Sequence, residues 1–208
     1  QSGLRVILFE ENADVGGQLL NEPTDAVNGA QEQWRWDVVA ALTAAPNVTI
    51  LTRTICWGRF DGNTLAAHEC VNAKVRQNYH KVHASKIIIA TGAIERPMVF
   101  ANNDKPGVML AAAARRMLNH YGVAVGRTLV VFTNNNSAYQ TAFDYQANGI
   151  DTLLVDSRSE PPTKLVAACA KQGVQLQTGA VVIRARGWHG VRTVVLADLS
   201  ADGKGVVR

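Results

Sequence analysis

The stretch Arg5-Val6-Ile7-Leu8-Phe9-Glu10 is the part of this 208-residue chain that decides its fold. It is an apolar run that ends on an acidic residue, and Gly16-Gly17-Gln18-Leu19 follows shortly after it. We interpret the run as the second strand of a dinucleotide-binding βαβ unit, because a carboxylate at that strand's C-terminal end accepts hydrogen bonds from ribose hydroxyls. The glycine fingerprint expected about 20 residues upstream is absent, and the sequence opens Gln1-Ser2-Gly3-Leu4. The sequence therefore predicts an internal segment of a longer protein.

Composition narrows the class of protein. Hydrophobic residues make up 47% of the chain and charged residues 18%, which predicts a folded core rather than disorder. The net charge is +4, but no run of five or more basic residues occurs, so we expect no nucleic-acid partner. No apolar run reaches the roughly 18–20 residues of a membrane span, so we expect no membrane association. Cys56, Cys70 and Cys169 form no C-x-x-C motif, which favours a reduced, cytoplasmic setting.

The first half of the chain alternates between helix and strand and then changes pattern. Residues 31–45 predict a helix that Pro46-Asn47 ends, and residues 48–52 predict the next strand of a parallel sheet. Residues 56–85 predict an antiparallel meander around the turn Asp61-Gly62-Asn63. The run 87–89 predicts a fully buried strand that returns to the parallel sheet.

The second half repeats the order strand, helix, strand with a terminal acid, Asp156. Beyond a loop at 94–107, we expect helices at 108–121, 137–147 and 163–171, strands at 128–132, 152–155 and 174–177, and a hairpin over 180–198. The predicted fold class is α/β: a Rossmann-like FAD/NAD(P)-binding fold, a parallel sheet with an antiparallel meander, plus a second, inserted Rossmann-like domain. The predicted domains are residues 1–107, lacking the glycine loop, and 108–208.

The candidate ligand-binding residues cluster around Glu10. Gly16 and Gly17 allow backbone N–H groups to approach a ligand closely, and Thr91-Gly92 is predicted to do the same at the end of a buried strand. A solvated loop carboxylate is the alternative for Glu10. Cys56 is predicted to line an adenine pocket; a small buried apolar residue is the competing explanation, and the two are compatible.

A second nucleotide site at Asp156 is less well supported by the sequence. Side chains at Asn134, Asn135 and Asn136 occupy the positions of a glycine loop and would block a pyrophosphate. Either the second unit binds a dinucleotide or its site is altered or closed. The spacing of His80 and His83 puts them on opposite faces of a strand, so we expect surface histidines and no metal site.

Two longer stretches resemble a known family. Residues 88–97, IIATGAIERP, and 100–111, FANNDKPGVMLA, are similar to the α subunits of heterotetrameric sarcosine oxidases, as is 134–139, NNNSAY. The resemblance covers essentially the whole chain and extends to amine and opine dehydrogenases and cyanide-forming glycine oxidases. The sequence departs from the family pattern at Gln18, where a smaller hydroxyl residue is frequent, and at Ile94, where His is found.

The resemblance implies a function. The family oxidises sarcosine to glycine, yields formaldehyde or methylenetetrahydrofolate, and reduces oxygen to hydrogen peroxide. It implies NAD in this subunit, FAD and FMN elsewhere in a complex with β, γ and δ subunits, and tetrahydrofolate at a C-terminal domain missing here. By position, the NAD-binding residues would be Glu10, Glu11, Gly16, Gly17, Gln18, Cys56, Ala90, Thr91 and Gly92.

We therefore expect the NAD-binding part of a sarcosine oxidase α subunit, inactive by itself and without catalytic residues of its own. The first alternative is an NAD(P)H-dependent disulfide-reductase-like flavoprotein with FAD at Glu10, or an amine or opine dehydrogenase subunit. The second is a structural subunit that only holds partners together.

Overall fold

The computed structural model describes residues 3–23, 29–72, 76–200, 202–203 and 205–207. The chain divides into two compact units. Unit 1 comprises residues 1–20 and 24–93, and unit 2 comprises residues 21–23 and 94–208. The sequence predicted two nucleotide-binding domains that meet between residues 107 and 108. The two compact units do not test nucleotide binding, so that domain boundary stays a prediction.

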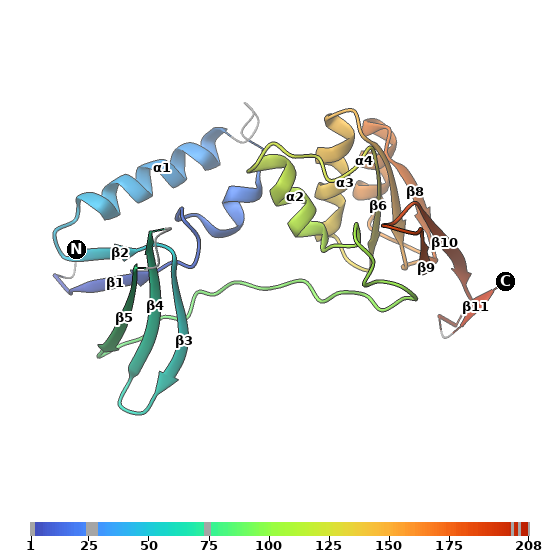
Figure 1. Ribbon diagram of the computed structural model, residues 1–208. Coiled ribbons are helices and arrows are strands. Elements are labelled where there is room, and N and C mark those ends of the chain that lie inside the picture. The colour runs from blue at the N-terminus through green and yellow to red at the C-terminus, as the bar shows by residue number, and fades with distance from the viewer. Residues whose placement is uncertain (1–2, 24–28, 73–75, 201, 204, 208) are drawn as a thin grey trace. The chain divides into compact units, whose positions relative to one another are not determined.

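Unit 1 is built around a short parallel sheet. Strand β1 (Val6–Phe9) pairs with β2 (Val48–Leu51), and the helix α1 (Gly29–Ala44) joins them and runs alongside (Figure 1). A short 3₁₀ turn, η1 (Gly17–Asn21), precedes α1. Helix α1 ends just before Pro46-Asn47, as expected. The backbone N–H of Val6 donates to the Asn47 carbonyl, and this bond aligns the two strands. The predicted βαβ order is confirmed.

The antiparallel meander is also confirmed. Strands β3 (Thr54–Phe60), β4 (Thr64–Asn72) and β5 (Arg76–His83) form a three-stranded sheet in the order β3-β4-β5. The turn between β3 and β4 uses left-handed backbone at Gly62 (φ 66°) and Asn63 (φ 52°), which only glycine and asparagine adopt at low cost.

The strand predicted at 87–89 is wrong. These residues form no strand, and Ile88 and Ile89 are 91% and 74% exposed. Within the described ranges β1 and β2 pair only with each other, so no strand edge meets the apolar run. Apolar character predicted burial, but burial in a sheet also needs a neighbouring strand.

Unit 2 has a three-stranded parallel sheet at its centre. Strands β6 (Thr128–Thr133), β7 (Asp151–Asp156) and β8 (Gln175–Thr178) alternate with helices α3 (Ser137–Ala147) and α4 (Thr163–Gln172). The predicted second βαβ unit is confirmed almost to the residue. Gly173 ends α4 in left-handed backbone (φ 73°), as its position after the helix predicted.

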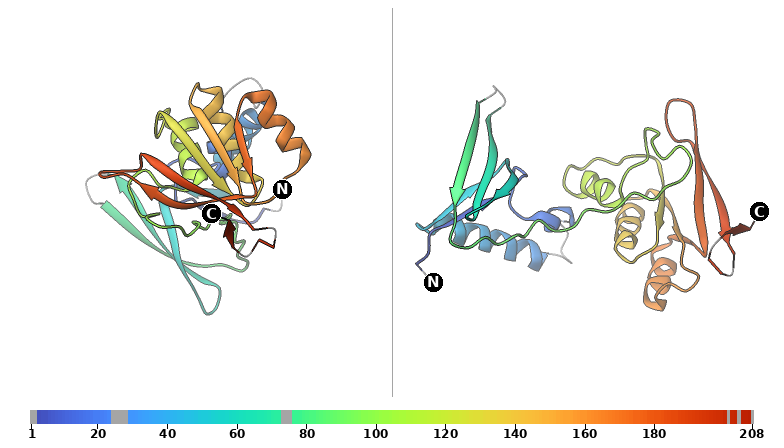
Figure 2. Two further views of the ribbon diagram at one scale, coloured as in Figure 1. Left: turned by 90° about the vertical axis from the view of Figure 1, so that its right-hand side faces the viewer. Right: turned by 90° about the horizontal axis from the view of Figure 1, so that it is seen from below.

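Further elements cover the central sheet of unit 2. Helix α2 (Ala111–Asn119) packs on α3, and the hairpin of β9 (Ala180–Arg186) and β10 (Thr193–Leu199) lies on the opposite side of the sheet (Figure 2). The two-residue strand β11 (Val206–Val207) extends the hairpin. Helix α2 is shorter than the predicted 108–121, since Leu110 is extended and a Glu95 carboxylate oxygen accepts a hydrogen bond from the Ala112 N–H.

The core of unit 2 lies between α3, α4 and the sheet. Its buried members include Tyr139 and Ala142 of α3, Leu154 of β7 and Cys169 of α4. Their spacing puts one face of each helix on the sheet, so the parallel strands are held by apolar contact from the helical side. Among the described helices none is both long and apolar enough to span a bilayer.

We predict that Leu154→Ala destabilises unit 2 by about 2–5 kcal/mol, because it leaves a cavity at a side chain that is now fully buried. Urea unfolding measures the change. Val166→Ala on α4 is the control, since Val166 is 38% exposed and its truncation should cost no more than about 0.5 kcal/mol. Equal losses in the two variants would contradict this location of the core.

Candidate functional site

Glu10 lies directly after β1, at the carboxyl end of the parallel pair. Its backbone N–H donates to the Leu51 carbonyl (2.9 Å), and its own carbonyl accepts from the Thr54 N–H (2.8 Å). These two bonds lock the backbone at the strand end. The side chain is half-buried, so the carboxylate of Glu10 is held at the sheet edge without being sealed from solvent.

The Glu10 carboxylate is oriented by Asn12. Its Oε1 atom accepts hydrogen bonds from the Asn12 backbone N–H (2.8 Å) and from Asn12 Nδ2 (2.7 Å). Both bonds go to the same oxygen, and among the described residues none is seen to Oε2. A carboxylate offers acceptor sites on both oxygens, so Oε2 of Glu10 remains available as an acceptor while Asn12 fixes Oε1.

The Gly16-Gly17 pair has a backbone that other residues adopt only with strain. Gly16 has φ 153° and Gly17 has φ 53°, and a Cβ atom at Gly16 would lie 2.7 Å from Cδ of Arg35. The Arg35 guanidinium in turn donates to the Val15 carbonyl (3.2 Å). Around Gly17 nothing lies within 4 Å of where a Cβ would be, so this glycine is open on its side-chain face.

The other predicted site residues are exposed to solvent. Glu11 and Gln18 are exposed next to Glu10 and Gly17. Cys56 is exposed on β3, two residues after Thr54, which bonds to Glu10; the alternative that it is buried is wrong. Ala90, Thr91 and Gly92 are exposed and follow the run that fails to form a strand, so their role at a cofactor stays a prediction.

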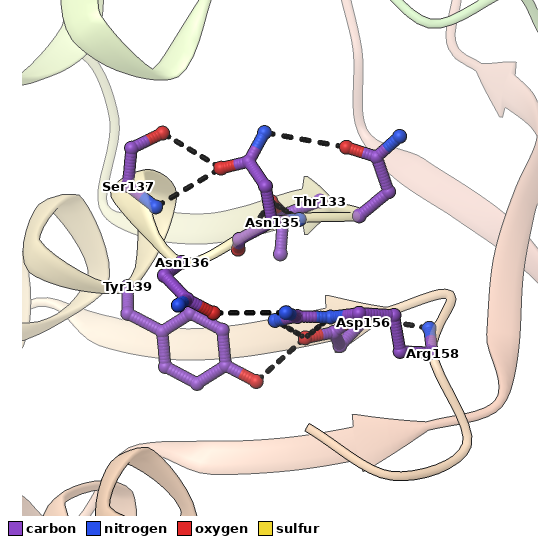
Figure 3. A network of polar contacts seen from close by, with 8 residues as sticks. Thr133, Asn135, Asn136, Ser137, Tyr139, Asp156 and Arg158 are labelled. Atoms are coloured by element: carbon purple, nitrogen blue, oxygen red, sulfur yellow. Dashed lines mark hydrogen bonds and ion pairs between the residues drawn. The ribbon is translucent and has the colours of Figure 1, made fainter. Parts of the chain in front are cut away.

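The equivalent acid of unit 2 is in a different environment. Asp156 is fully buried at the end of β7, and Tyr139 Oη of α3 donates to it at 2.7 Å. Arg158 donates to the same carboxylate from its backbone N–H (2.9 Å), from Nε (3.0 Å) and from Nη2 (2.6 Å). Figure 3 shows Tyr139 and Arg158 converging on Asp156. The carboxylate is neutralised from within the unit.

The protonation of this cluster follows from its contacts. Burial by itself would raise the pKa of Asp156, but the hydrogen bonds from Arg158 and Tyr139 outweigh it and lower that pKa. Burial and the neighbouring Asp156 carboxylate raise the pKa of Tyr139, so its hydroxyl stays protonated and keeps donating. The Asp156 carboxylate is therefore ionised and fully engaged, which supports the altered or closed alternative for unit 2.

The loop before α3 reinforces that conclusion. Arg158 Nη1 reaches across to Asn136 Oδ1 (2.8 Å), and Asn135 Oδ1 accepts from the backbone N–H (2.9 Å) and the hydroxyl (2.7 Å) of Ser137 (Figure 3). Asn135 thus holds the backbone at Ser137, the first residue of α3. None of Asn134, Asn135 and Asn136 adopts left-handed backbone.

Two of the five histidines, His80 and His83, contact neighbouring polar side chains. His80 Nε2 lies 2.8 Å from Glu69 Oε2, and His83 Nδ1 lies 2.8 Å from the Thr64 hydroxyl. In the described part of the chain no group of three or more His, Cys, Asp or Glu side chains is arranged to hold a metal ion.

Sequence reasoning missed one charged cluster in unit 2. Arg115 of α2 forms a two-pronged pair with Glu22 (2.8 Å for each bond) and donates from Nε to Asp144 of α3 (2.5 Å). Burial by itself would lower the pKa of Arg115. The hydrogen bonds to Glu22 and Asp144 outweigh burial and raise that pKa. Glu22 and Arg115 are 93 positions apart, so no local pattern could have found the pair.

Two curated proteins match much of the sequence. The chain is 41% identical over 167 residues to sarcosine oxidase subunit alpha of Rhizobium meliloti, with 76% of this chain and 17% of that protein covered. It is 36% identical over 217 residues to sarcosine oxidase subunit alpha of Corynebacterium sp. strain P-1, with coverages of 97% and 22%. The chain thus spans about a fifth of the length of these relatives. No protein-family model matches the sequence.

Solved structures share the fold. L-proline dehydrogenase from P. horikoshii superposes with a TM-score of 0.65 at 23% identity, over 91% of this chain and 33% of that one. Thioredoxin reductase from T. acidophilum gives the same TM-score of 0.65 at 12% identity, over 98% of this chain and 73% of that one. The chain therefore shares the mixed α/β fold of these proteins, with parallel sheets and antiparallel meanders.

We predict that Arg158→Gln destabilises unit 2 by about 2–3 kcal/mol, because the buried Asp156 carboxylate loses its charged partner. Arg127→Gln, an exposed change in the same unit, is the control and should be near neutral. Urea unfolding measures both. An Arg158→Gln variant as stable as the control would mean that the pair does not neutralise Asp156.

The pH dependence has a defined sign. Because the pKa of Asp156 is lowered in the folded state, its ionised form stabilises the protein above the unfolded-state pKa of about 3.9. That contribution disappears as the pH falls through the lower, folded-state pKa. Unfolding measured between about pH 2 and pH 7 should therefore lose part of its acid sensitivity in Asp156→Asn, and an unchanged profile would contradict the assignment.

Proposed function

Because this chain is a homologue of sarcosine oxidase α subunits, we propose that it is the part of such a subunit that binds NAD, at Glu10 and the Gly16–Gln18 loop. The observation that carries the proposal is the Glu10 carboxylate. It stands at the carboxyl end of β1, fixed through Oε1 by Asn12, with its second oxygen available as an acceptor. A ribose hydroxyl is the donor that such an oxygen takes in dinucleotide-binding folds.

The residues present fit a dinucleotide. Gly17 is open where a side chain would be, so a phosphate or ribose could approach its backbone, and exposed Gln18 and Glu11 flank the same segment. In this proposal Cys56 lines the adenine, since its strand starts at the residue bonded to Glu10. Ala90, Thr91 and Gly92 would follow the cofactor on a segment whose apolar residues gain a partner strand in the whole subunit.

Unit 2 would hold no dinucleotide in this proposal. Its Asp156 already accepts bonds from Arg158 and Tyr139, which take the place of ribose hydroxyls. Asn135 and Asn136 add side chains where a pyrophosphate needs bare backbone. This support favours one nucleotide site in the chain, in unit 1.

The reaction of the whole assembly would be oxidative demethylation of sarcosine to glycine, with formaldehyde or methylenetetrahydrofolate and hydrogen peroxide as the other products. The redox chemistry would be supplied by flavins bound elsewhere in a complex with β, γ and δ subunits, and folate by a further domain. The residues 94–107 carry the exposed side chains of Ile94 (86%) and Val99 (92%), and we propose that this segment faces a partner subunit near the flavin.

The main rival is a disulfide-reductase-like flavoprotein with FAD at Glu10. The nucleotide released from the denatured native complex, identified by mass spectrometry, separates the alternatives. NAD supports the proposal, FAD supports the rival, and a complex that releases no nucleotide from this subunit would support a purely structural role.

We predict that Glu10→Ala weakens NAD retention by about 1–3 kcal/mol in the full-length subunit, the scale of lost charged hydrogen bonds. The NAD content of the purified complex measures it. Asp14→Ala, an exposed acid in the same loop, is the matched control and should retain NAD. Unchanged NAD content in Glu10→Ala would refute the assignment of Glu10.

A further inference from the structure

The chain enters unit 2 twice, and the first entry is only Asn21–Pro23. Those residues directly follow Leu20, where the first segment of unit 1 ends, two residues after the proposed nucleotide-binding loop Gly16–Gln18. Leu20 and Asn21 are both buried, at 8% and 7% exposure. The segment Asn21–Pro23 belongs to unit 2 but continues directly from the loop of unit 1, so contacts within unit 2 must hold it in place.

Those contacts come from α2. Arg115 donates one hydrogen bond to each carboxylate oxygen of Glu22, both at 2.8 Å, and Asn119 Nδ2 donates to the Asn21 carbonyl at 2.8 Å. The Arg115 and Glu22 side chains are 12% and 31% exposed. A forked pair fixes both the distance and the plane of its partners, which a single bond does not.

Contacts other than the pair with Glu22 also hold α2 against α3. Asp144 already accepts from Arg115 Nε, from Asn119 Nδ2 (2.7 Å) and from Gln140 Nε2 (2.8 Å). The Tyr145 hydroxyl also donates to the Ala114 carbonyl (2.9 Å), joining the same helices. The bonds from Arg115 to Glu22 therefore attach residues 21–23 to helix α2, in addition to the contacts between α2 and α3.

A half-buried ion pair is also a poor source of net stability, because desolvation of the two charges offsets much of their attraction. Its geometric effect is larger. Only Gln18, Leu19 and Leu20 separate Gly17 from the tethered Asn21, and the Leu19 N–H already closes a turn on the Gly16 carbonyl (3.1 Å). Fixing Asn21 and Glu22 limits the conformations that this turn can adopt.

We propose that the Arg115–Glu22 pair is a clamp that positions the Gly16–Leu20 turn for binding the dinucleotide, an inference that rests on the function proposed above. Arg115 and Glu22 are positioning residues, since neither is placed at the nucleotide. The proposal makes nucleotide affinity in unit 1 depend on a charge pair in unit 2.

Amide hydrogen exchange in the full-length subunit within its complex tests the clamp directly. In Glu22→Gln the Leu19 amide should exchange on the order of tenfold faster, and NAD affinity should fall about three- to tenfold, which lies within the range of such couplings. The amide of Val155, in the core of unit 2, should keep its rate. Glu160→Gln, an exposed change in the same unit, should alter neither.

Two results would overturn the clamp: an unchanged Leu19 rate in Glu22→Gln, or Leu19 and Val155 accelerating together, which would mean general loss of stability. Failure of the proposed function looks different. There, the wild-type complex would hold no NAD or Glu10→Ala would retain it fully. That result overturns the nucleotide role of the turn, while the Leu19 rate still decides whether Glu22 restrains it.

Discussion

A carboxylate at the carboxyl end of a parallel strand needs hydrogen-bond donors, and the way each unit supplies them determines what the unit can do. In unit 2 the donors are internal, since Tyr139 and Arg158 satisfy Asp156 within a closed network. In unit 1 the donors are only partly internal, since Asn12 fixes one oxygen of Glu10. Two strand-end acids in similar topological positions therefore have different chemistry, one structural and one able to accept a ligand.

The two acids have different surroundings in a chain that is similar to sarcosine oxidase α subunits. The fold provides two strand ends that carry an acid, and in unit 2 side chains of the chain itself surround that acid. The asparagine-rich loop and Arg158 are mutually supporting, because the guanidinium that neutralises Asp156 also bonds to Asn136. To free the Asp156 carboxylate for a ligand, substitutions would be needed both at Tyr139 and Arg158 and in the loop that contains Asn136.

The sequence was sufficient where local pattern and packing agree. The alternation over 128–178 fixed the strands and helices of unit 2 closely, because each apolar face meets a neighbour from the same stretch of chain. It failed at 87–89, where burial depends on a strand that the described residues do not supply. The spacing of Asp156 and Arg158 could have suggested their pairing, whereas Glu22 and Arg115 are brought together only by the tertiary fold. The candidate residues Glu10, Gly16 and Gly17 were identifiable because acid and glycine chemistry is readable locally, but the Asn12 contact that orients the acid was not.

The early passage of the chain through unit 2 at Asn21–Pro23 has a consequence for how this protein could be dissected or recombined. The two units do not correspond to two contiguous stretches of gene, so a crossover at any one point breaks at least one of them. A segment beginning at Ile94 would carry Arg115 with Asp144 but without Glu22, so the guanidinium would lose one of its two carboxylate partners. Exchange of either unit between relatives would have to carry the residues around Glu22 along with α2.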